Sequence, residues 1–205
     1  MEKIPTTIRG IARRKALLET AGKLFQEKGY ANTSINEIVQ QAGGSLSTAY
    51  KWFPSKEMLF MAVFEHRLSE IGAYIAGLSM DAATPKEAVR RILTVPYHFE
   101  AERQLQTFLF DGIRIPAFRE NALKIFQENL VVPLEKHFRD IGERFHFRYR
   151  LGVELTVTLL IRTMRGMALE FLLCDGDLKF RREAVMEQTL TLFQNLIEFQ
   201  DGDAR

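Results

Sequence analysis

The side chains best suited to chemistry in this sequence lie close together, in the stretch SLSTAYKW at residues 45–52. Hydroxyl groups, a phenol and a lysine ammonium donate or accept hydrogen bonds, and they suit phosphate oxygens or the edges of bases. Leu46 adds an apolar group that can contact a thymine methyl. The solvent face of an ordinary helical hairpin has a similar composition. The elements around the stretch must therefore decide between the two interpretations.

Two predicted helices precede this stretch. Residues 13–28 place apolar side chains at helical spacing. Ser34 and Glu37 form a capping box, in which each side chain binds a free backbone N–H of the other, and this predicts the start of a second, short helix. The pair Gly43-Gly44 then makes a tight turn.

The stretch itself is predicted to be a third helix. Ser45 can cap it, and Pro54 ends it because the residue before a proline avoids the helical region. Ala49 and Phe53 should face inward. Two short helices joined by a tight turn form a helix-turn-helix unit, which places its second helix in the major groove of DNA. Free N–H groups and Lys56 at the start of the next helix would bind a phosphate.

The charge distribution agrees with this interpretation. Residues 1–58 hold nine basic and five acidic residues, a net charge of +4, whereas the whole chain carries +2 and the remainder therefore −2. A basic end on a mildly acidic body favours a polyanion as partner. The residues expected to contact DNA are Arg13, Arg14, Thr33, Ser45, Leu46, Ser47, Thr48, Tyr50, Lys51 and Lys56.

The stretch TSINEIVQQAGGSLSTAYKWFPSKEMLF, residues 33–60, resembles the N-terminal signature of tetracycline-repressor (TetR) family regulators. The matching positions, at gap-free spacing, are Thr33, Ala42, Gly43, Ser45, Thr48, Tyr50, Phe53, Ser55, Lys56, Glu57 and Leu59. The chain departs from the family pattern at Gly44, usually valine, and at Ser47, Ala49 and Trp52. The Gly44 difference should remove a core side chain from the turn.

The resemblance implies an all-α protein. A three-helix DNA-binding domain, residues 1–58, would join a larger helical ligand-binding and dimerisation domain, residues 59–205. Such proteins are homodimeric repressors that bind a palindromic operator and are released by a small molecule. The sequence permits dimerisation, because predicted helices 149–174 and 181–200 are apolar over a wide arc. The expected interface residues are Val157, Leu160, Ala168, Leu192, Phe193 and Leu196, which could instead complete the core of one subunit.

An aromatic-rich set between the linker and the last helices could line an apolar ligand cavity with a few orienting charges. Its members are Tyr97, Phe108, Asp111, Arg114, Phe118, Phe126, Arg162, Met164, Met167 and Phe171. A hydrophobic or aromatic small-molecule effector would fit them. The competing interpretation is a packed core with surface charges, which leaves a DNA-binding regulator controlled by a partner protein, or an activator.

Other function classes find little support. The sequence lacks a phosphate-binding glycine loop, a nucleophile elbow and a paired metal motif, so we expect neither an enzyme nor a cofactor or metal. A binding protein whose N-terminal DNA-binding domain is inactive stays open as an alternative. No apolar run reaches membrane-spanning length, and the single cysteine, Cys174, is typical of a reducing cytoplasm. Further helices are expected at 85–94, 98–113 and 117–140, with a connector at 146–150.

Overall fold

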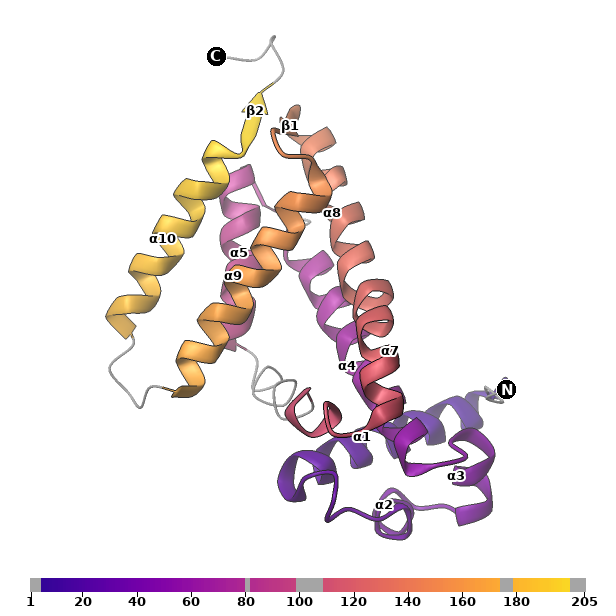
Figure 1. Cartoon of the computed structure of the whole chain (residues 1–205). Coiled ribbons are helices and arrows are strands. Elements are labelled where there is room, and N and C mark those ends of the chain that lie inside the picture. Colours follow the sequence, from indigo (N-terminus) through magenta and orange to yellow (C-terminus); the bar gives the residue numbers. More distant parts are fainter. Residues whose placement is uncertain (1–4, 80–81, 99–108, 174–178, 200–205) are drawn as a thin grey trace. The chain divides into compact units, whose positions relative to one another are not determined.

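The computed structural model describes residues 5–79, 82–98, 109–173 and 179–199, which form a helical protein with one small ribbon of strands (Figure 1). The described residues pack as two compact units. Unit one comprises those of 1–68 and 104–126, and unit two comprises those of 69–103 and 127–205. The predicted all-α class is confirmed. The predicted division at residue 58 stays a prediction.

The first three helices of unit one begin at hydroxyl side chains. Helix α1 (Ile8–Lys28) starts after Thr7, α2 (Ile35–Ala42) after Ser34 and α3 (Leu46–Trp52) after Ser45. Each hydroxyl oxygen accepts a backbone N–H of the first turn, the usual geometry of an N-cap. Helix α1 is longer than the predicted 13–28 because the Thr7 cap adds a turn ahead of its apolar residues.

Unit one is completed by parts of two later helices. Helix α4 (Lys56–Ser79) starts in this unit, where Ser55 accepts the N–H of Met58, and it continues into unit two. Helix α7 (Pro116–Phe126) belongs to unit one. The ring of Phe118 from α7 lies 5.3 Å from that of Phe60 and 5.0 Å from that of Phe64, both in α4. The core of unit one therefore includes side chains far beyond residue 58.

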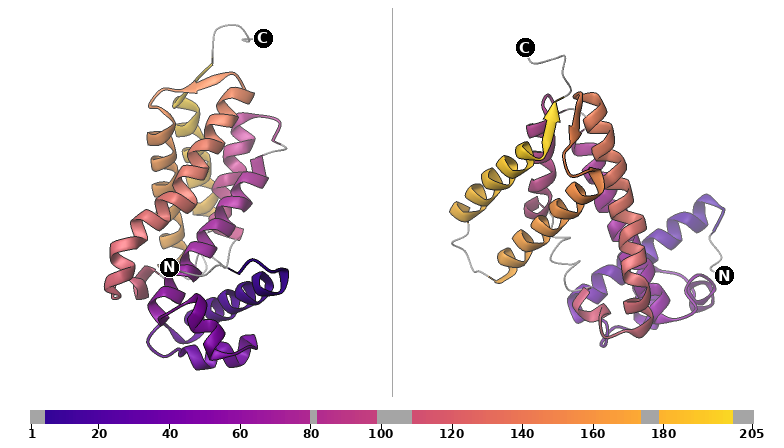
Figure 2. Two further views of the ribbon diagram at one scale, coloured as in Figure 1. Left: turned by 90° about the vertical axis from the view of Figure 1, so that its right-hand side faces the viewer. Right: turned by 45° about the horizontal axis from the view of Figure 1, so that its top comes forward.

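Unit two contains the end of α4 and the helices α5 (Pro85–His98), α8 (Val132–Arg144), α9 (Val153–Leu173) and α10 (Lys179–Asn195). Helix α5 packs against α9 and α10, and α8 packs against α9 (Figure 2). The predicted single helix 117–140 is wrong in one respect. A π-helical turn, η1 (Gln127–Val131), precedes Pro133. Since proline lacks an N–H and its ring crowds the carbonyl four residues earlier, a widened turn accommodates it.

The expected connector at 146–150 is instead a β-strand. Strand β1 (Phe147–Tyr149) and strand β2 (Ile197–Phe199) lie side by side (Figure 1). They pair antiparallel, with Arg148 opposite Glu198. The two strands lie about 50 residues apart in sequence, so no local pattern indicates their pairing. The predicted helix 181–200 therefore ends early, at Asn195.

Candidate nucleic-acid interface

Helix α3 has one buried and one exposed face. Ala49 and Trp52 point inward, with 3% and 6% of their surface exposed. Leu46 and Tyr50 are 39% and 48% exposed. Ser47 and Lys51 are exposed as well. Within each of the pairs 46/50 and 47/51 the two residues lie four positions apart, about one helical turn, so the four side chains form a single stripe along α3. The stripe carries an apolar, a hydroxyl, a phenol and an ammonium group.

The hydroxyl groups at the start of α3 are already ordered. Ser45 Oγ accepts the N–H of Thr48 at 3.3 Å and lies 2.8 Å from Thr48 Oγ1 and 3.1 Å from Ser47 Oγ. Ser45 therefore serves first as the cap of α3. Ser47 and Thr48 keep donor or acceptor capacity, since a hydroxyl forms several hydrogen bonds.

Two arginines of α1 lie beside α3. The Arg14 guanidinium is 5.0 Å from the centre of the Phe53 ring, a cation–π distance that ties α1 to the end of α3. Arg13 is exposed, and a Cβ added to Gly44 would lie 3.9 Å from its Cδ. Gly44 is itself exposed at φ 136°, so the turn loses no core side chain there, contrary to expectation.

Lys56 and Thr33 have structural partners. Lys56 Nζ donates to the carbonyl of Ala31 at 3.3 Å and lies 4.3 Å from the centre of the Tyr30 ring, where desolvation lowers the pKa of the lysine. The Thr33 side chain is buried, and its hydroxyl donates to the carbonyls of Leu24 and Gly29. Thr33 therefore supports the turn before α2, and a contact between its side chain and DNA would require it to leave this position.

The comparisons with known proteins agree with this geometry. Residues 17–63 match the family model described as bacterial regulatory proteins, tetR family. The chain is 35% identical over 141 residues to YuxN, an uncharacterized helix-turn-helix transcriptional regulator of Bacillus subtilis, covering 69% of this chain and 45% of that protein. This chain belongs to the TetR family. Members are DNA-binding regulators and not enzymes, in agreement with the predicted class.

Two further relatives extend the comparison of this TetR-family chain. It is 32% identical over 80 residues to the transcriptional repressor NicS of Pseudomonas putida, covering 39% of this chain and 38% of NicS. A putative transcriptional regulator from Saccharomonospora viridis, solved in complex with choline, has the same fold with a TM-score of 0.64 at 19% identity, over 91% of this chain and 98% of that one. The matched part spans less than half the length of YuxN and NicS.

The predicted ligand-binding residues are divided between the two units of the described structure. In unit one, Phe118 is buried against Phe60 and Phe64, and the Asp111 carboxylate accepts the N–H of Tyr30 at 2.8 Å. Arg114 is exposed and Phe126 half-buried in the same unit; Arg162 is exposed and Met164 half-buried in unit two. Phe108 and the side chains of Tyr97, Met167 and Phe171 lie outside the described residues. Ligand binding by this set stays a prediction.

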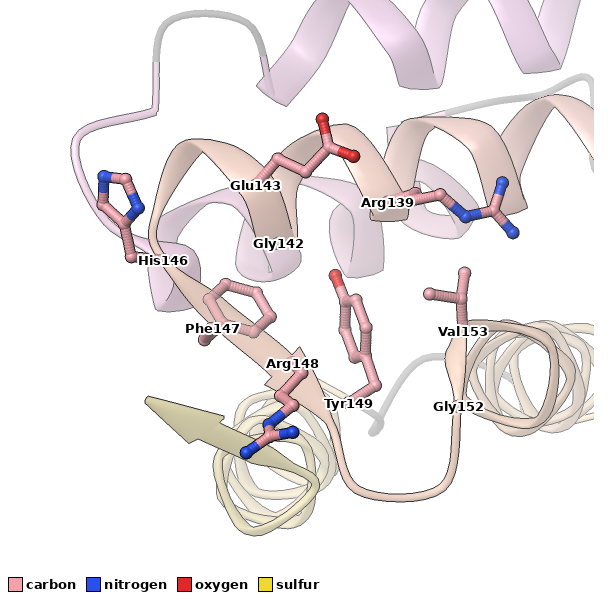
Figure 3. A pocket seen from close by; sticks show the side chains of 9 residues that line it. All are labelled: Arg139, Gly142, Glu143, His146, Phe147, Arg148, Tyr149, Gly152 and Val153. Carbon is pink, nitrogen blue, oxygen red and sulfur yellow. The ribbon is translucent and has the colours of Figure 1, made fainter. Parts of the chain in front are cut away.

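A pocket of about 510 Å³ lies elsewhere in unit two, where α8, β1 and the start of α9 meet. Figure 3 shows that its polar side chains diverge. Arg139 forms an ion pair with Glu154 at 3.2 Å, and the Tyr149 hydroxyl donates to the carbonyl of Phe138 at 2.6 Å. Arg148 extends toward β2 (Figure 3). A specific ligand site needs converging polar groups, so this pocket does not indicate a ligand class.

The predicted dimer-interface residues differ in their exposure. Val157, Leu160 and Phe193 are buried within the single chain, whereas Leu192 is 64% exposed. Leu196 is half-buried, and the side chain of Ala168 lies outside the described residues. Leu155 and Leu159 of α9, which were not predicted, are 47% and 38% exposed. Their four-residue spacing places them on one exposed face of α9.

The described residues support neither a metal site nor a membrane-spanning helix. Among them, no three His, Cys, Asp or Glu side chains gather to hold a metal ion. In the same part of the chain, no helix combines the length and apolar character that crossing a membrane requires.

Proposed function

We propose that this TetR-family chain is a homodimeric repressor that reads a palindromic operator with α3. The observation that carries the proposal is the exposed stripe of Leu46, Ser47, Tyr50 and Lys51, whose groups suit base edges and phosphates. Arg13 adds a positive charge beside the turn at Gly44. The match to the repressor NicS over 80 residues supports the same direction of control.

Dimerisation would use the outer faces of α9 and α10. Leu155, Leu159 and Leu192 expose apolar surface there, and a second subunit would remove it from water. The two DNA-binding domains of the dimer would then bind half-sites that lie one turn of the DNA double helix, roughly 34–36 Å, apart. A ligand that changes the distance between the two DNA-binding domains would shift the population of dimers toward a state that cannot bind both half-sites.

The effector proposed for this dimer is a small hydrophobic or aromatic molecule bound in the C-terminal domain. The choline complex of the Saccharomonospora viridis protein supports a small-molecule effector on this fold. A regulator without such an effector is the second candidate. It is favoured by the contacts of Asp111 and Phe118, which hold these predicted ligand residues in the interior of unit one.

The decisive experiment is capture of DNA. Purified protein is mixed with fragmented genomic DNA of its own organism at near-physiological salt, and the retained fragments are sequenced. We expect one palindromic site, whose retention falls steeply with salt and is lost in a Tyr50→Ala, Lys51→Ala double variant. Diffuse retention that this variant leaves unchanged would contradict the assignment of α3. Release of the retained site by candidate molecules then separates the two forms of control.

A further inference from the structure

The turn between α1 and α2, residues 29–33, is held by several hydrogen bonds. The Gly29 N–H donates to Phe25, closing α1, and the Thr33 hydroxyl donates to the carbonyls of Leu24 and Gly29. The N–H of Thr33 donates to the carbonyl of Tyr30 at 3.4 Å. These bonds fix the shape of the turn from within.

Two side chains from other elements fix the turn from outside. Lys56 of α4 donates to the carbonyl of Ala31. The carboxylate of Asp111 accepts the N–H of Tyr30 at 2.8 Å, a contact between residues 81 positions apart. Each of the two hydrogen bonds involves one charged group, but the Asp111 contact is the shorter, at 2.8 Å against 3.3 Å for Lys56, so it should be the firmer of the two.

The Asp111 carboxylate lies beside Gly29, the residue that follows α1. Gly29 has φ 77°, a conformation that favours glycine, and a Cβ added there would lie 3.5 Å from Asp111 Oδ2. The backbone next to Asp111 packs closely on the core, because a Cβ at the next residue, Gly112, would lie 2.3 Å from the ring of Phe118. Phe118 is in turn packed against Phe60 and Phe64. The position of Asp111 is therefore set by the aromatic core of unit one.

The turn determines where the DNA-reading helix lies. It leads directly to Ser34 and α2, which packs against α1, and α3 follows after the turn at Gly43 and Gly44. A shift of the Tyr30 backbone would therefore move α2 and, with it, α3. We propose that Asp111 is a positioning residue for DNA recognition, which acts through the Tyr30 amide to hold α2 and α3 in the binding arrangement. This inference rests on the proposed DNA-binding function.

Three variants of the full-length protein test this role. Asp111→Ala removes the acceptor, whereas Asp111→Asn keeps an oxygen that can accept the same N–H. Glu120→Ala, which removes an exposed carboxylate of α7, is the matched control. Affinity is measured for the fragment that the wild type retains and for a random duplex of equal length, each over a range of salt concentrations. Exchange of the Tyr30 amide hydrogen is followed without DNA.

We expect Asp111→Ala to bind the retained fragment about tenfold more weakly, as loss of one hydrogen bond to a charged group predicts. Its affinity for the random duplex and its salt dependence should not change, because no phosphate contact is lost. Asp111→Asn and Glu120→Ala should stay within about threefold of the wild type, and only Asp111→Ala should speed exchange of the Tyr30 amide.

Wild-type affinity for the retained fragment in Asp111→Ala would overturn the proposal, as would an equal loss on the random duplex. If Asp111→Ala does not fold, exchange in the wild type decides: a protected Tyr30 amide supports the contact, and an amide as fast as an exposed one overturns it. A wild type that retains no specific fragment refutes the proposed function itself, an outcome distinct from the others.

Discussion

Short elements are held in place by different means in unit one and at the ribbon end of unit two, which comprises β1, β2 and the adjoining end of α8. In unit one, α2 and α3 begin at the hydroxyl caps of Ser34 and Ser45 and α2 packs against both α1 and α3, while a cluster of aromatic rings joins α1, α4 and α7. In unit two, β1 is fixed by its pairing with β2 and by the Tyr149 hydroxyl on α8. A Cβ at Gly142 of α8 would lie 3.1 Å from the carbonyl oxygen of Phe147, so the strand packs closely against the helix.

This difference has a functional consequence. The Ser45 cap and the buried side chains of Ala49 and Trp52 stabilise α3 without using its outer face, which stays exposed at Leu46 and Tyr50. At the ribbon end, by contrast, the Tyr149 hydroxyl and Arg139 are bonded within the chain. Helix α3 is stabilised through its buried face, so the polar groups of its outer face can bind a partner. The Tyr149 hydroxyl and Arg139, by contrast, already bind groups of their own chain.

The largest expected effect is on the ring cluster of unit one. Phe118→Ala should lower the free energy of unfolding by about 3–5 kcal/mol, because Phe118 is 1% exposed and leaves a cavity. Urea unfolding is followed by the fluorescence of Trp52, the single tryptophan, which lies in α3. Phe110→Ala, at a residue 65% exposed, is the control and should change stability by less than about 0.5 kcal/mol. Equal effects of the two variants would refute the ring cluster as a support of unit one.

The next effect is on the ribbon end. Tyr149→Phe should cost about 1–3 kcal/mol, because it leaves the buried carbonyl of Phe138 without its donor. Burial raises the pKa of Tyr149, so the unfolded chain loses this proton first above about pH 10 and wild-type stability falls as pH rises. The variant should show a shallower fall. Urea unfolding followed by circular dichroism measures both, and a variant with wild-type stability at pH 7 would contradict the role of the hydroxyl.

A smaller effect is expected for the exposed face of α3. Lys51→Ala should weaken binding to operator and random DNA alike and reduce the slope of log affinity against log salt by about 0.9, one phosphate contact. Lys23→Ala removes an equally exposed lysine from α1, where it pairs with Glu27 at 3.9 Å, and should leave the slope unchanged. Fluorescence anisotropy at several salt concentrations measures the slope. Identical slopes for the two variants would exclude Lys51 from the interface.

The smallest effect concerns acid stability of unit two. Burial lowers the pKa of His137, against the opposing effect of Asp140, so below about pH 6.5 the unfolded chain binds this proton more readily than the folded one. Stability should therefore fall as pH drops through this range, and less in His137→Gln. Thermal unfolding between pH 5 and 7.5 measures the difference. A parallel pH dependence in both proteins would show that other groups control it.

Much of the N-terminal helical region, α1 to the start of α4, could be predicted from the sequence. The caps at Ser34, Ser45 and Ser55 lie three residues from the N–H groups that they bind, so local spacing shows them. The inward direction of Ala49 and Phe53 follows from helical periodicity and is confirmed by their burial. The Thr7 cap was missed because the residues just after it are exposed and carry no apolar pattern.

The sequence by itself thus determined where α2, α3 and α4 begin and which face of α3 is polar, because both depend on residues within one or two helical turns. Only the tertiary structure decided that Asp111 binds the Tyr30 amide, that Phe118 completes the core of unit one, and that β1 pairs with β2. Each of these joins residues some 50 to 80 positions apart, and loop closure over such distances leaves no periodic pattern in the chain.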